Sequence, residues 1–344
     1  MYKGTGISKD QLSDDGEPCI LYGELYTKYK SETIREVISK TNIDNTKLVR
    51  SKANDVIIPC SGETAEDIAT ARCVLNGNIL LGGDLNIIRL HGYDGAFMSY
   101  QLNGRRKYDI AKVAQGVSVV HLYGEHMKGV KTINPCLKEQ KKIASLLALL
   151  DERISTQNKI IDKLQSLIKG IAQKIVHNNK PNVRLTECLE CKSSTLQESE
   201  VCEQGTYPVY GANGIVGYLD NYNTEGEAVY IIKDGSGVGT VSYVTGKCSA
   251  TGTLNTLQAK EGYSLQYFYY LLKVFNFEPY KTGMAIPHIY FKDYGKAKVF
   301  CPSYTEQLQY ARLLSAIESN LSIEMNILTN LSLQKQYLLR QMFI

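Results

Sequence analysis

Tryptophan is absent from this chain of 344 residues, and phenylalanine occurs only seven times, whereas there are 24 tyrosines. The sequence also lacks a run of the roughly 20 apolar residues that a membrane-spanning helix requires. Its first residues, MYKGTGISKDQLSDDG, contain no apolar segment of the kind that directs secretion. We therefore expect neither a membrane span nor a signal peptide, and we expect a cytoplasmic location.

Motifs of nucleotide-dependent and hydrolytic enzymes are missing as well. There is no GxxxxGK(S/T), GxSxG or HExxH segment. The stretch DGSGVGT, which begins at Asp234, is followed by the strand-like TVSYV, whereas a dinucleotide-binding loop opens a helix. His121 and His288 each follow a hydrophobic stretch, which favours structural over catalytic histidines. The sequence therefore predicts no cofactor and no catalytic residue.

The cysteines do not form the pattern of a metal site. Nine of them are scattered along the chain, and Cys188 and Cys191 stand at CxxC spacing. Cys202 and Cys248 follow singly, whereas a structural zinc site normally shows a second close pair of ligands. We expect reduced thiols and no metal. The net charge of +4 permits an acidic partner but does not require one.

Two segments far apart in the sequence are nearly the same. NPCLKEQKKIASLLALLDERI begins at Asn134, and FCPSYTEQLQYARLLSAIESNL begins at Phe300. The Glu-Gln pair at 139 matches the pair at 306, and 306 − 139 = 167. The same offset relates Pro135 and Pro302, Ala144 and Ala311, Leu146 and Leu313, Leu147 and Leu314, Ile160 and Ile327, and Leu164 and Leu331. Such an internal repeat determines the architecture of the chain.

Both copies have the periodicity of a long helix with one apolar stripe. The first stripe is Ile143, Leu147, Leu150, Ile154, Gln157, Ile161, Leu164, Ile168, Ile171 and Ile175. The second is Tyr310, Leu314, Ile317, Leu321, Glu324, Leu328, Leu331, Lys335, Leu338 and Met342. The first stripe predicts a helix of roughly 60 Å. We expect the two helices to pair through these stripes, with matched polar positions at 157 and 324; the alternative is that each packs on its own domain.

The segments between the helices repeat more weakly. GNILLGGDLNII and GKCSATGTLNTL share G-x5-G-x-L-N, and Gly116, His121 and Tyr123 match Gly283, His288 and Tyr290 at the offset of 167. Short apolar runs such as DVIIP, NIIRL and AVYII indicate strands, and AEDIATARCVL and SLQYFYYLLKVF indicate short helices. The resulting order is domain 1–134, helix 135–180, domain 181–300 and helix 301–344. We expect each domain to be α+β with a mixed or antiparallel sheet.

This order, with P-x3-EQ-x3-A-x-LL opening each helix, resembles the specificity (S) subunit of bacterial and archaeal type I restriction-modification systems. SGET-x-EDIA, PCILYGELYTKY and YPVYGANGIVGYLDNY also resemble segments of that family's target-recognition domains. The resemblance covers the whole chain. It implies two target-recognition domains separated by two long antiparallel helices, which form a coiled-coil spacer, and a pseudo-twofold internal repeat.

The same resemblance implies a function without catalysis in this subunit. Each domain would read one half of an asymmetric bipartite site in double-stranded DNA. Methyltransferase (M) subunits, two in number, would bring S-adenosylmethionine, and restriction (R) subunits would join through the complex and bring ATP hydrolysis and cleavage. In this family a short strand usually precedes the first domain, whereas here Met1 falls almost directly on KGTGIS. We expect that domain to be trimmed or to be completed by the C-terminal end of the chain.

Candidate DNA-contacting residues follow from the chemistry of the two kinds of contact. Phosphates favour Lys and Arg, and base edges favour Arg, Lys, Asn, Gln and side chains on loops. In the first domain we select Tyr22, Tyr26, Lys28, Ser61, Glu63, Thr64, Arg105, Arg106 and Lys107. In the second domain we select Asn213, Tyr218, Lys233, Ser236, Lys247 and Lys281.

Two other functions stay open at this point: an enzyme that acts on DNA alone, and a coiled-coil scaffold or interaction protein without DNA readout. One argument from the residues favours the bipartite reader. A site that is not a palindrome requires two different readers on one chain, because a homodimer would impose its symmetry on the site.

Overall fold

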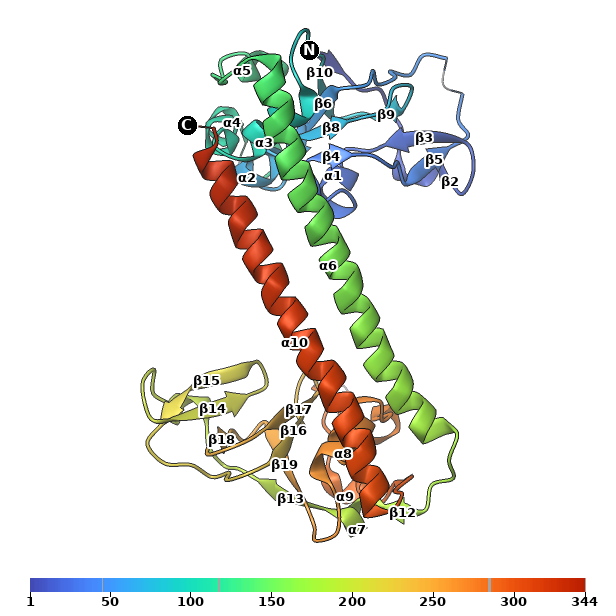
Figure 1. Ribbon diagram of the computed structural model, residues 1–344, viewed down its shortest axis with the longest axis vertical. Helices are drawn as coiled ribbons and strands as arrows, with labels where there is room; N and C mark the ends of the chain where they lie inside the picture. The colour runs from blue at the N-terminus through green and yellow to red at the C-terminus, as the bar shows by residue number, and fades with distance from the viewer. Residues whose placement is uncertain (45, 117, 284–285, 344) are drawn as a thin grey trace. The chain divides into compact units, whose positions relative to one another are not determined.

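A computed structural model of the chain describes residues 1–44, 46–116, 118–283 and 286–343. The chain divides into two compact units: unit 1 is Met1–Asn158 with Asn326–Ile344, and unit 2 is Lys159–Met325. Each unit contains one domain with strands and one part of each of two long helices, α6 and α10, drawn in green and red in Figure 1. Neither long helix therefore belongs to one unit alone.

The helices in the described part of the chain are α1 (Glu24–Thr27), α2 (Ala65–Ile68), α3 (Gly95–Asn103), α4 (Lys107–Val113), α5 (Gly124–Met127), α6 (Leu137–His177), α7 (Leu185–Cys188), α8 (Leu265–Lys273), α9 (Phe291–Tyr294) and α10 (Tyr304–Gln341). Short 3-10 turns occur at Lys9–Gln11, Glu198–Glu200 and Glu278–Tyr280. The long helix expected from the first stripe is confirmed by α6, which runs for 41 residues.

The strands of unit 1 are β1 (Tyr2–Lys3), β2 (Leu12–Ser13), β3 (Glu17–Ile20), β4 (Thr33–Ile34), β5 (Ser39–Thr41), β6 (Asp55–Pro59), β7 (Ser61–Gly62), β8 (Arg72–Val74), β9 (Leu80–Leu81), β10 (Leu85–Ile88) and β11 (Val120–His121). The strands of unit 2 are β12 (Val183–Arg184), β13 (Leu189–Ser193), β14 (Tyr207–Gly211), β15 (Gly214–Leu219), β16 (Ala228–Ile232), β17 (Val241–Val244), β18 (Ser249–Ala250), β19 (Leu254–Ala259) and β20 (Lys298–Val299).

Unit 1 is built around a five-stranded sheet in the order β1-β10-β6-β8-β4, in which only β4 and β8 are parallel. Every residue of β6 is buried, because both faces of the sheet are covered. Val56 and Ile58 pack on one face with Met98 of α3, and Ile57 packs on the other with Leu25 of α1. A continuous apolar run such as DVIIP is typical of a strand in this position.

The smaller sheets of unit 1 lie at the edges of this core. One has the order β2-β5-β3-β9, in which β3 and β9 are parallel, and the other pairs β7 with β11. The mixture of parallel and antiparallel pairs agrees with the expected α+β class.

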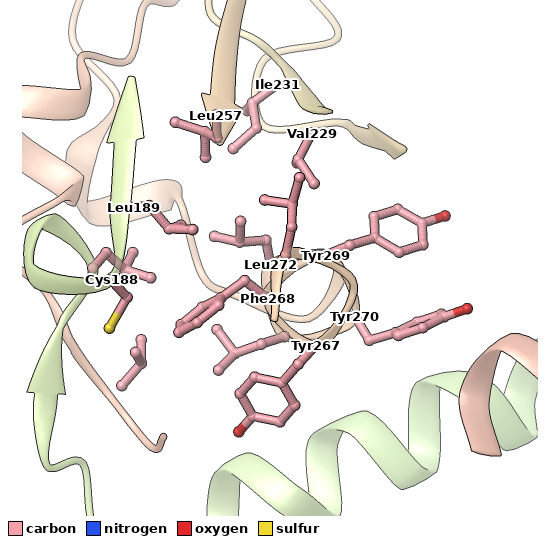
Figure 2. Packing of buried hydrophobic residues seen from close by; sticks show 14 of the residues in the cluster. Cys188, Leu189, Val229, Ile231, Leu257, Tyr267, Phe268, Tyr269, Tyr270 and Leu272 are labelled. Carbon is pink, nitrogen blue, oxygen red and sulfur yellow. The ribbon is translucent and has the colours of Figure 1, made fainter. Parts of the chain in front are cut away.

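Unit 2 has a four-stranded antiparallel sheet in the order β13-β19-β16-β17. Val229 and Ile231 of β16 and Leu257 of β19 lie opposite Phe268 and Leu272 of α8, as Figure 2 shows. The alternate residues of β16 point to the other face, because successive side chains of a strand point in opposite directions. Both faces are therefore buried, and each fully buried apolar side chain stabilises the fold by about 1.5–3 kcal/mol.

Two further sheets complete unit 2. The hairpin β14–β15 is joined by β18, which is parallel to β14, and β12 pairs with β20. The expected strand after DGSGVGT is β17, so the three glycines lie in a turn between two strands.

One expected helix is wrong and one is confirmed. The stretch AEDIATARCVL does not form a single helix: α2 ends at Ile68, and residues 72–74 form β8. The reason is that β8 pairs with β6 and β4 in the central sheet, and tertiary pairing overrides local propensity. The stretch SLQYFYYLLKVF forms α8, whose first turn is capped by the Ser264 hydroxyl, which accepts from the backbone N–H of Tyr267 at 3.4 Å.

Within unit 1 the first half of α6 packs antiparallel to the last half of α10. Leu147 of α6 is buried in one cluster with Phe343, whose ring lies 5.3 Å from the ring of Phe97 in α3. Further along α6, Asp151 accepts from the ammonium group of Lys335 in α10 at 2.6 Å. The last turns of α10 and Phe343 thus pack within unit 1.

Within unit 2 the second half of α6 and the first half of α10 pack on α8. Ile168 and Ile175 of α6 share a core with Ala311 and Leu314 of α10. Across both units, the thirteen side chains selected for helix pairing are buried or half-buried: Ile143, Leu147, Leu150, Ile154, Gln157, Ile161, Leu164, Leu314, Ile317, Leu321, Glu324, Leu328 and Leu331. The neighbouring Leu146 is 50% exposed and Leu149 is 60% exposed.

The Glu-Gln motif at the start of each long helix docks that helix on its domain. The side-chain oxygen of Gln140 accepts from the backbone N–H of Asp94, the N-cap of α3, at 2.9 Å, and that of Gln307 accepts from Ser264, the N-cap of α8, also at 2.9 Å. Each glutamine donates to a proline carbonyl just before its own helix, at 2.8 and 2.9 Å. Both glutamines are fully buried, so each fixes a helix start against a domain.

Candidate nucleic-acid interface

Four of the residues selected in the first domain line one hollow. Tyr22, Tyr26, Ser61 and Glu63 surround a volume of about 600 Å³ together with Thr27, Asp67, Ser118 and Val119. Tyr26 lies in α1 and Tyr22 lies just before it, whereas β7 and the segment after it supply Ser61 and Glu63. Polar and aromatic groups that converge around an open hollow suit a nucleic-acid ligand.

Tyr26 holds the two sides of this hollow together. Its hydroxyl donates to the backbone carbonyl of Ser61 at 3.1 Å. Burial, followed by the nearby Asp67 carboxylate, raises the pKa of Tyr26, so the phenol stays protonated at neutral pH. Tyr22 is 39% exposed and leaves an aromatic face available to a ligand.

Two other selected residues of this domain have partners within the protein. The ammonium group of Lys28 lies 2.7 Å from the carboxylate of Glu24 and donates to Ser39 at 2.7 Å. Thr64 caps α2, since its hydroxyl oxygen accepts from the backbone N–H of Asp67 at 3.0 Å. Both side chains stabilise the loops beside the hollow.

The basic triple of the first domain lies at a different place. Arg105, Arg106 and Lys107 join α3 to α4, and Arg106 lies 3.4 Å from Asp109. The preceding Gly104 touches α10: a Cβ added there would lie 2.6 Å from the carbonyl oxygen of Leu339. None of these three residues is among those that line the hollow.

In the second domain, one group of selected residues gathers on two loops that hydrogen-bond to each other. Lys233 and Ser236 follow β16, and Lys281 begins the loop that leads to His288. The carbonyl of Lys233 accepts from the N–H of Ile289 at 2.9 Å. Lys281 is paired with Glu278 at 2.5 Å, and this contact is exposed on the Glu278 side.

A second group lies on the hairpin and the turn before β18. Asn213 is exposed at the tip of the β14–β15 hairpin, and Tyr218 is half-buried in β15. The ammonium group of Lys247 lies 4.9 Å from the centre of the Tyr222 ring and 3.8 Å from Glu225. Contact with the Tyr222 hydroxyl raises the pKa of Lys247, so this exposed cation stays charged.

The sequence did not indicate a polar groove in unit 2. It has a volume of about 680 Å³ and is lined by Lys192, Ser193, Ser194, Thr195, Leu196, Glu200, Leu219, Asn221, Tyr222, Asn223, Ser249 and Thr256. These residues come from four segments of the chain, and the fold alone brings them together. Short serine and asparagine stretches are common in loops, so no sequence pattern marks them as one surface.

The two matched histidines, His121 and His288, were interpreted from the sequence as structural and were not selected as DNA contacts. Both lie at the surface and outside the core. His121 is exposed on β11, and its Nδ1 lies 3.3 Å from the hydroxyl of Ser61. Nδ1 of His288 lies 2.7 Å from Oδ1 of Asp234. Each histidine thus stands among residues selected for DNA contact. Their common offset of 167 was the sequence pattern that could have identified them.

The described residues were also considered as ligands of a metal ion and as parts of a membrane-spanning helix. They contain no group of three or more His, Cys, Asp or Glu side chains that could hold a metal ion. None of the helices in this part of the chain is long and apolar enough to cross a membrane.

Comparison with known proteins gives a consistent family. Residues 179–333 match the family model described as the type I restriction modification DNA specificity domain. The Escherichia coli specificity subunit of the EcoprrI type I restriction enzyme is 26% identical over 117 residues, which are 34% of this chain and 29% of that relative. A type I specificity subunit of Mycoplasma pneumoniae is 25% identical over 254 residues, 66% of this chain and 67% of that protein.

Solved structures show the same fold. The type I restriction-modification S subunit of M. genitalium has a TM-score of 0.69 and 19% identity, and the match covers 100% of this chain and 93% of that one. A chain from a study of complex assembly and conformational transition in a type I system has a TM-score of 0.56 and 15% identity, covering 98% and 93% of the two chains. The match to the Escherichia coli relative spans less than a third of that protein's length.

Proposed function

We propose that this chain is a non-catalytic type I restriction-modification specificity subunit that reads an asymmetric bipartite site in double-stranded DNA. Residues 179–333 match the DNA specificity domain of that family, and the similar proteins are specificity subunits. Each domain reads one half of the site. Methylation and cleavage are supplied by partner subunits that this chain recruits.

One observation carries the proposal of two readers on a repeated frame. Gln140 and Gln307 stand 167 positions apart and make the same pair of hydrogen bonds, one to the N-cap of a domain helix and one to a proline carbonyl. The surfaces of the two domains differ, however: unit 1 has an aromatic hollow at Tyr22 and Tyr26, and unit 2 has a polar groove and a hairpin. A constant frame with different surfaces suits a bipartite site whose halves are not related by symmetry.

The side chains proposed to contact DNA are those at the hollow of unit 1 and on the loops and hairpin of unit 2. At the hollow, Tyr22 and Glu63 present aromatic and polar atoms, and in unit 2 Lys233, Ser236 and Lys247 present donors and positive charge. The basic triple at Arg105 is proposed to contact phosphates, because Arg and Lys suit phosphate oxygens and none of the three residues lines the hollow.

The long helices carry a second surface, which we assign to the methyltransferase subunits. Leu146 and Ile327 are 50% and 40% exposed in unit 1, and their counterparts at the offset of 167, Leu313 and Ile160, are 50% and 37% exposed in unit 2. Monomeric proteins rarely leave such helix faces uncovered. In unit 1 this face is hollowed by about 670 Å³ between α6 and α10.

The repetition of this apolar face supports two methyltransferase subunits, one on each unit. Restriction subunits join the complex through them. The paired helices α6 and α10 act as a coiled-coil spacer of fixed length, so the unread gap between the half-sites is constant for this subunit.

The experiment that tests the proposal is the mapping of methylated DNA motifs in cells with and without this gene, with the methyltransferase gene present in both. We expect an interrupted, asymmetric motif to be methylated in cells with the gene and to lose its methylation when the gene is deleted. Unchanged methylation after deletion would favour a scaffold without DNA readout. A palindromic motif without a gap would contradict the assignment of one half-site to each domain.

A further inference from the structure

Both domains carry the same small loop at equivalent positions. In unit 1, Gln115 and His121 exchange two backbone hydrogen bonds, at 2.9 and 2.7 Å. In unit 2, Thr282 and His288 do the same, also at 2.9 and 2.7 Å. Since 282 − 115 and 288 − 121 both equal 167, the two loops occupy the same place in the repeat.

A glycine closes each loop and brings the histidine into position. Gly116 has φ of 128° and Gly283 has φ of 88°, a region that other residues rarely adopt. A Cβ at Gly283 would lie 2.3 Å from the carbonyl oxygen of Ile286 and 3.0 Å from Cδ2 of His288. The ring of His288 therefore lies close to Gly283, and this close approach excludes a side chain at position 283.

Each histidine is followed two residues later by an exposed tyrosine with which it forms an aromatic pair. The rings of His121 and Tyr123 are 6.3 Å apart, and those of His288 and Tyr290 are 6.5 Å apart, with interplanar angles of 34° and 22°. Both tyrosines are 45% exposed. Aromatic faces at the surface are the groups on which nucleic-acid bases and sugars pack.

The partner of the histidine differs between the two domains. A carboxylate can only accept, so Nδ1 of His288 carries the hydrogen that Asp234 accepts at 2.7 Å. Nε2 of His288, which has no hydrogen-bond partner among the described residues, is thereby left for a ligand. In unit 1 the partner of His121 is the hydroxyl of Ser61, at 3.3 Å, which can donate or accept and leaves the imidazole tautomer free.

The surroundings of His288 are built to hold it and carry positive charge. The loop that contains His288 is joined to the loop after β16 by bonds from Ile289 N–H to the Lys233 carbonyl and from Gly235 N–H to the Pro287 carbonyl, at 2.9 and 3.0 Å. The ammonium group of Lys292 lies 5.2 Å from the centre of the Tyr290 ring. An imidazole held by Asp234, beside an exposed ring that a lysine contacts, suits a nucleic acid with base edges.

We propose that His288, held by Asp234, and His121, held by Ser61, are equivalent duplex-DNA contacts, one for each half-site, through Nε2 of each ring. The inference rests on the proposed function and adds to it residues that sequence analysis interpreted as structural. The fixed tautomer of His288 gives the second half-site a more selective hydrogen bond than the first, because a neutral ring can then only accept at Nε2.

The test uses the full chain assembled with its methyltransferase subunits. The probe is a fluorescein-labelled duplex that carries the motif mapped in cells with the wild-type gene, and a duplex with a scrambled motif serves as reference. We expect His288→Ala to weaken binding about tenfold, the loss expected of one hydrogen bond to a charged or polar group, and to reduce discrimination at one base pair of the second half-site. His121→Ala should have the corresponding effect on the first half-site.

Matched controls separate this inference from the proposed function. His177→Ala in unit 2 and His91→Ala in unit 1 replace exposed histidines outside the two loops and should leave binding unchanged. His288→Gln, which keeps a donor for Asp234 but no ring, repeats the test should the alanine variant lower the Tm. If wild type shows no motif-specific binding, the proposed function fails. If wild type is specific and the two loop variants bind as it does, this inference alone is wrong.

Discussion

Glu318 of α10 is a partly buried carboxylate that accepts hydrogen bonds from three side chains of α8. Its carboxylate accepts from the hydroxyl of Tyr269 at 2.9 Å, from that of Tyr270 at 2.8 Å and from the ammonium group of Lys273 at 2.9 Å. Burial alone would raise its pKa, but these donors outweigh burial and lower the pKa of Glu318 below its ordinary value of 4.5. The carboxylate thus joins α10 to α8.

The lowered pKa sets the direction of a pH effect on stability. A carboxyl group with a lower pKa in the folded state stabilises the protein above its unfolded pKa and loses that contribution as the pH falls through the folded pKa. We expect Glu318→Gln to lower the free energy of unfolding by about 1–3 kcal/mol at neutral pH, because charge-assisted hydrogen bonds are lost. The difference in Tm between wild type and variant should shrink as the pH falls below 4.5.

Thermal unfolding followed by circular dichroism across this pH range checks the prediction. A matched control is Glu261→Gln, which changes an exposed glutamate of unit 2 in the turn before α8. A gap in Tm between wild type and Glu318→Gln that stayed constant down to strongly acidic pH would show that the carboxylate charge is not what holds the two helices together.

Some of the residues selected from the sequence as DNA contacts lie together in the fold. Tyr22, Ser61 and Glu63 line one hollow, and their contact with DNA stays a prediction. The pairing of His288 with Asp234 could not be predicted from the sequence, because the two residues are 54 positions apart and only the fold brings them together. The side chain of Lys28 was selected as a DNA contact but is paired with Glu24, four residues earlier, a spacing at which opposite charges meet on a helix and which the sequence could have indicated.

The long helices are the elements that the sequence predicted best. A stripe of apolar residues at alternating spacings of three and four is a local pattern, and its side chains are buried or half-buried in both units. The short elements were harder: residues 72–74 have no periodicity of their own and become a strand because β6 and β4 provide neighbours. Local pattern thus sufficed for a 41-residue helix but not for a three-residue strand.

The two faces of α6 can be distinguished by charging neighbouring residues. Leu150 is 7% exposed and Leu149 is 60% exposed. Leu150→Lys should place an unpaired charge between α6 and α10 and lower the free energy of unfolding by roughly 3–5 kcal/mol. Leu149→Lys should leave the Tm nearly unchanged but weaken association with methyltransferase subunits, because its side chain lines the exposed hollow.

Denaturant titration and co-purification with the methyltransferase measure the two effects. Equal stability of the Leu150→Lys variant and wild type would mean that the helices do not pair along this stripe. Normal co-purification of the Leu149→Lys variant would place the methyltransferase surface elsewhere.

At the scale of the whole molecule, the two units dock their long helices through equivalent glutamines, Gln140 and Gln307, and differ in the hollows of their surfaces. The frame could be predicted because Gln140 and Gln307 occur in a repeated motif. The surfaces that we propose to read DNA could not be predicted from the sequence. The groove of unit 2, for example, is lined by residues between positions 192 and 256 that form no local sequence pattern. Base contacts depend on such loop geometry, so the sequence predicts that DNA is read but not which bases.

The central claim, two independent readers on a constant frame, is tested most directly by exchanging residues 181–300 for the equivalent domain of a type I specificity subunit with a different motif. The exchanged chain is assembled with its methyltransferase, and the methylated motif is mapped. We predict that one half of the motif changes to that of the donor, while the other half and the unread spacing stay as in wild type. A change in both halves, or a change in the spacing while α6 and α10 are intact, would contradict the account.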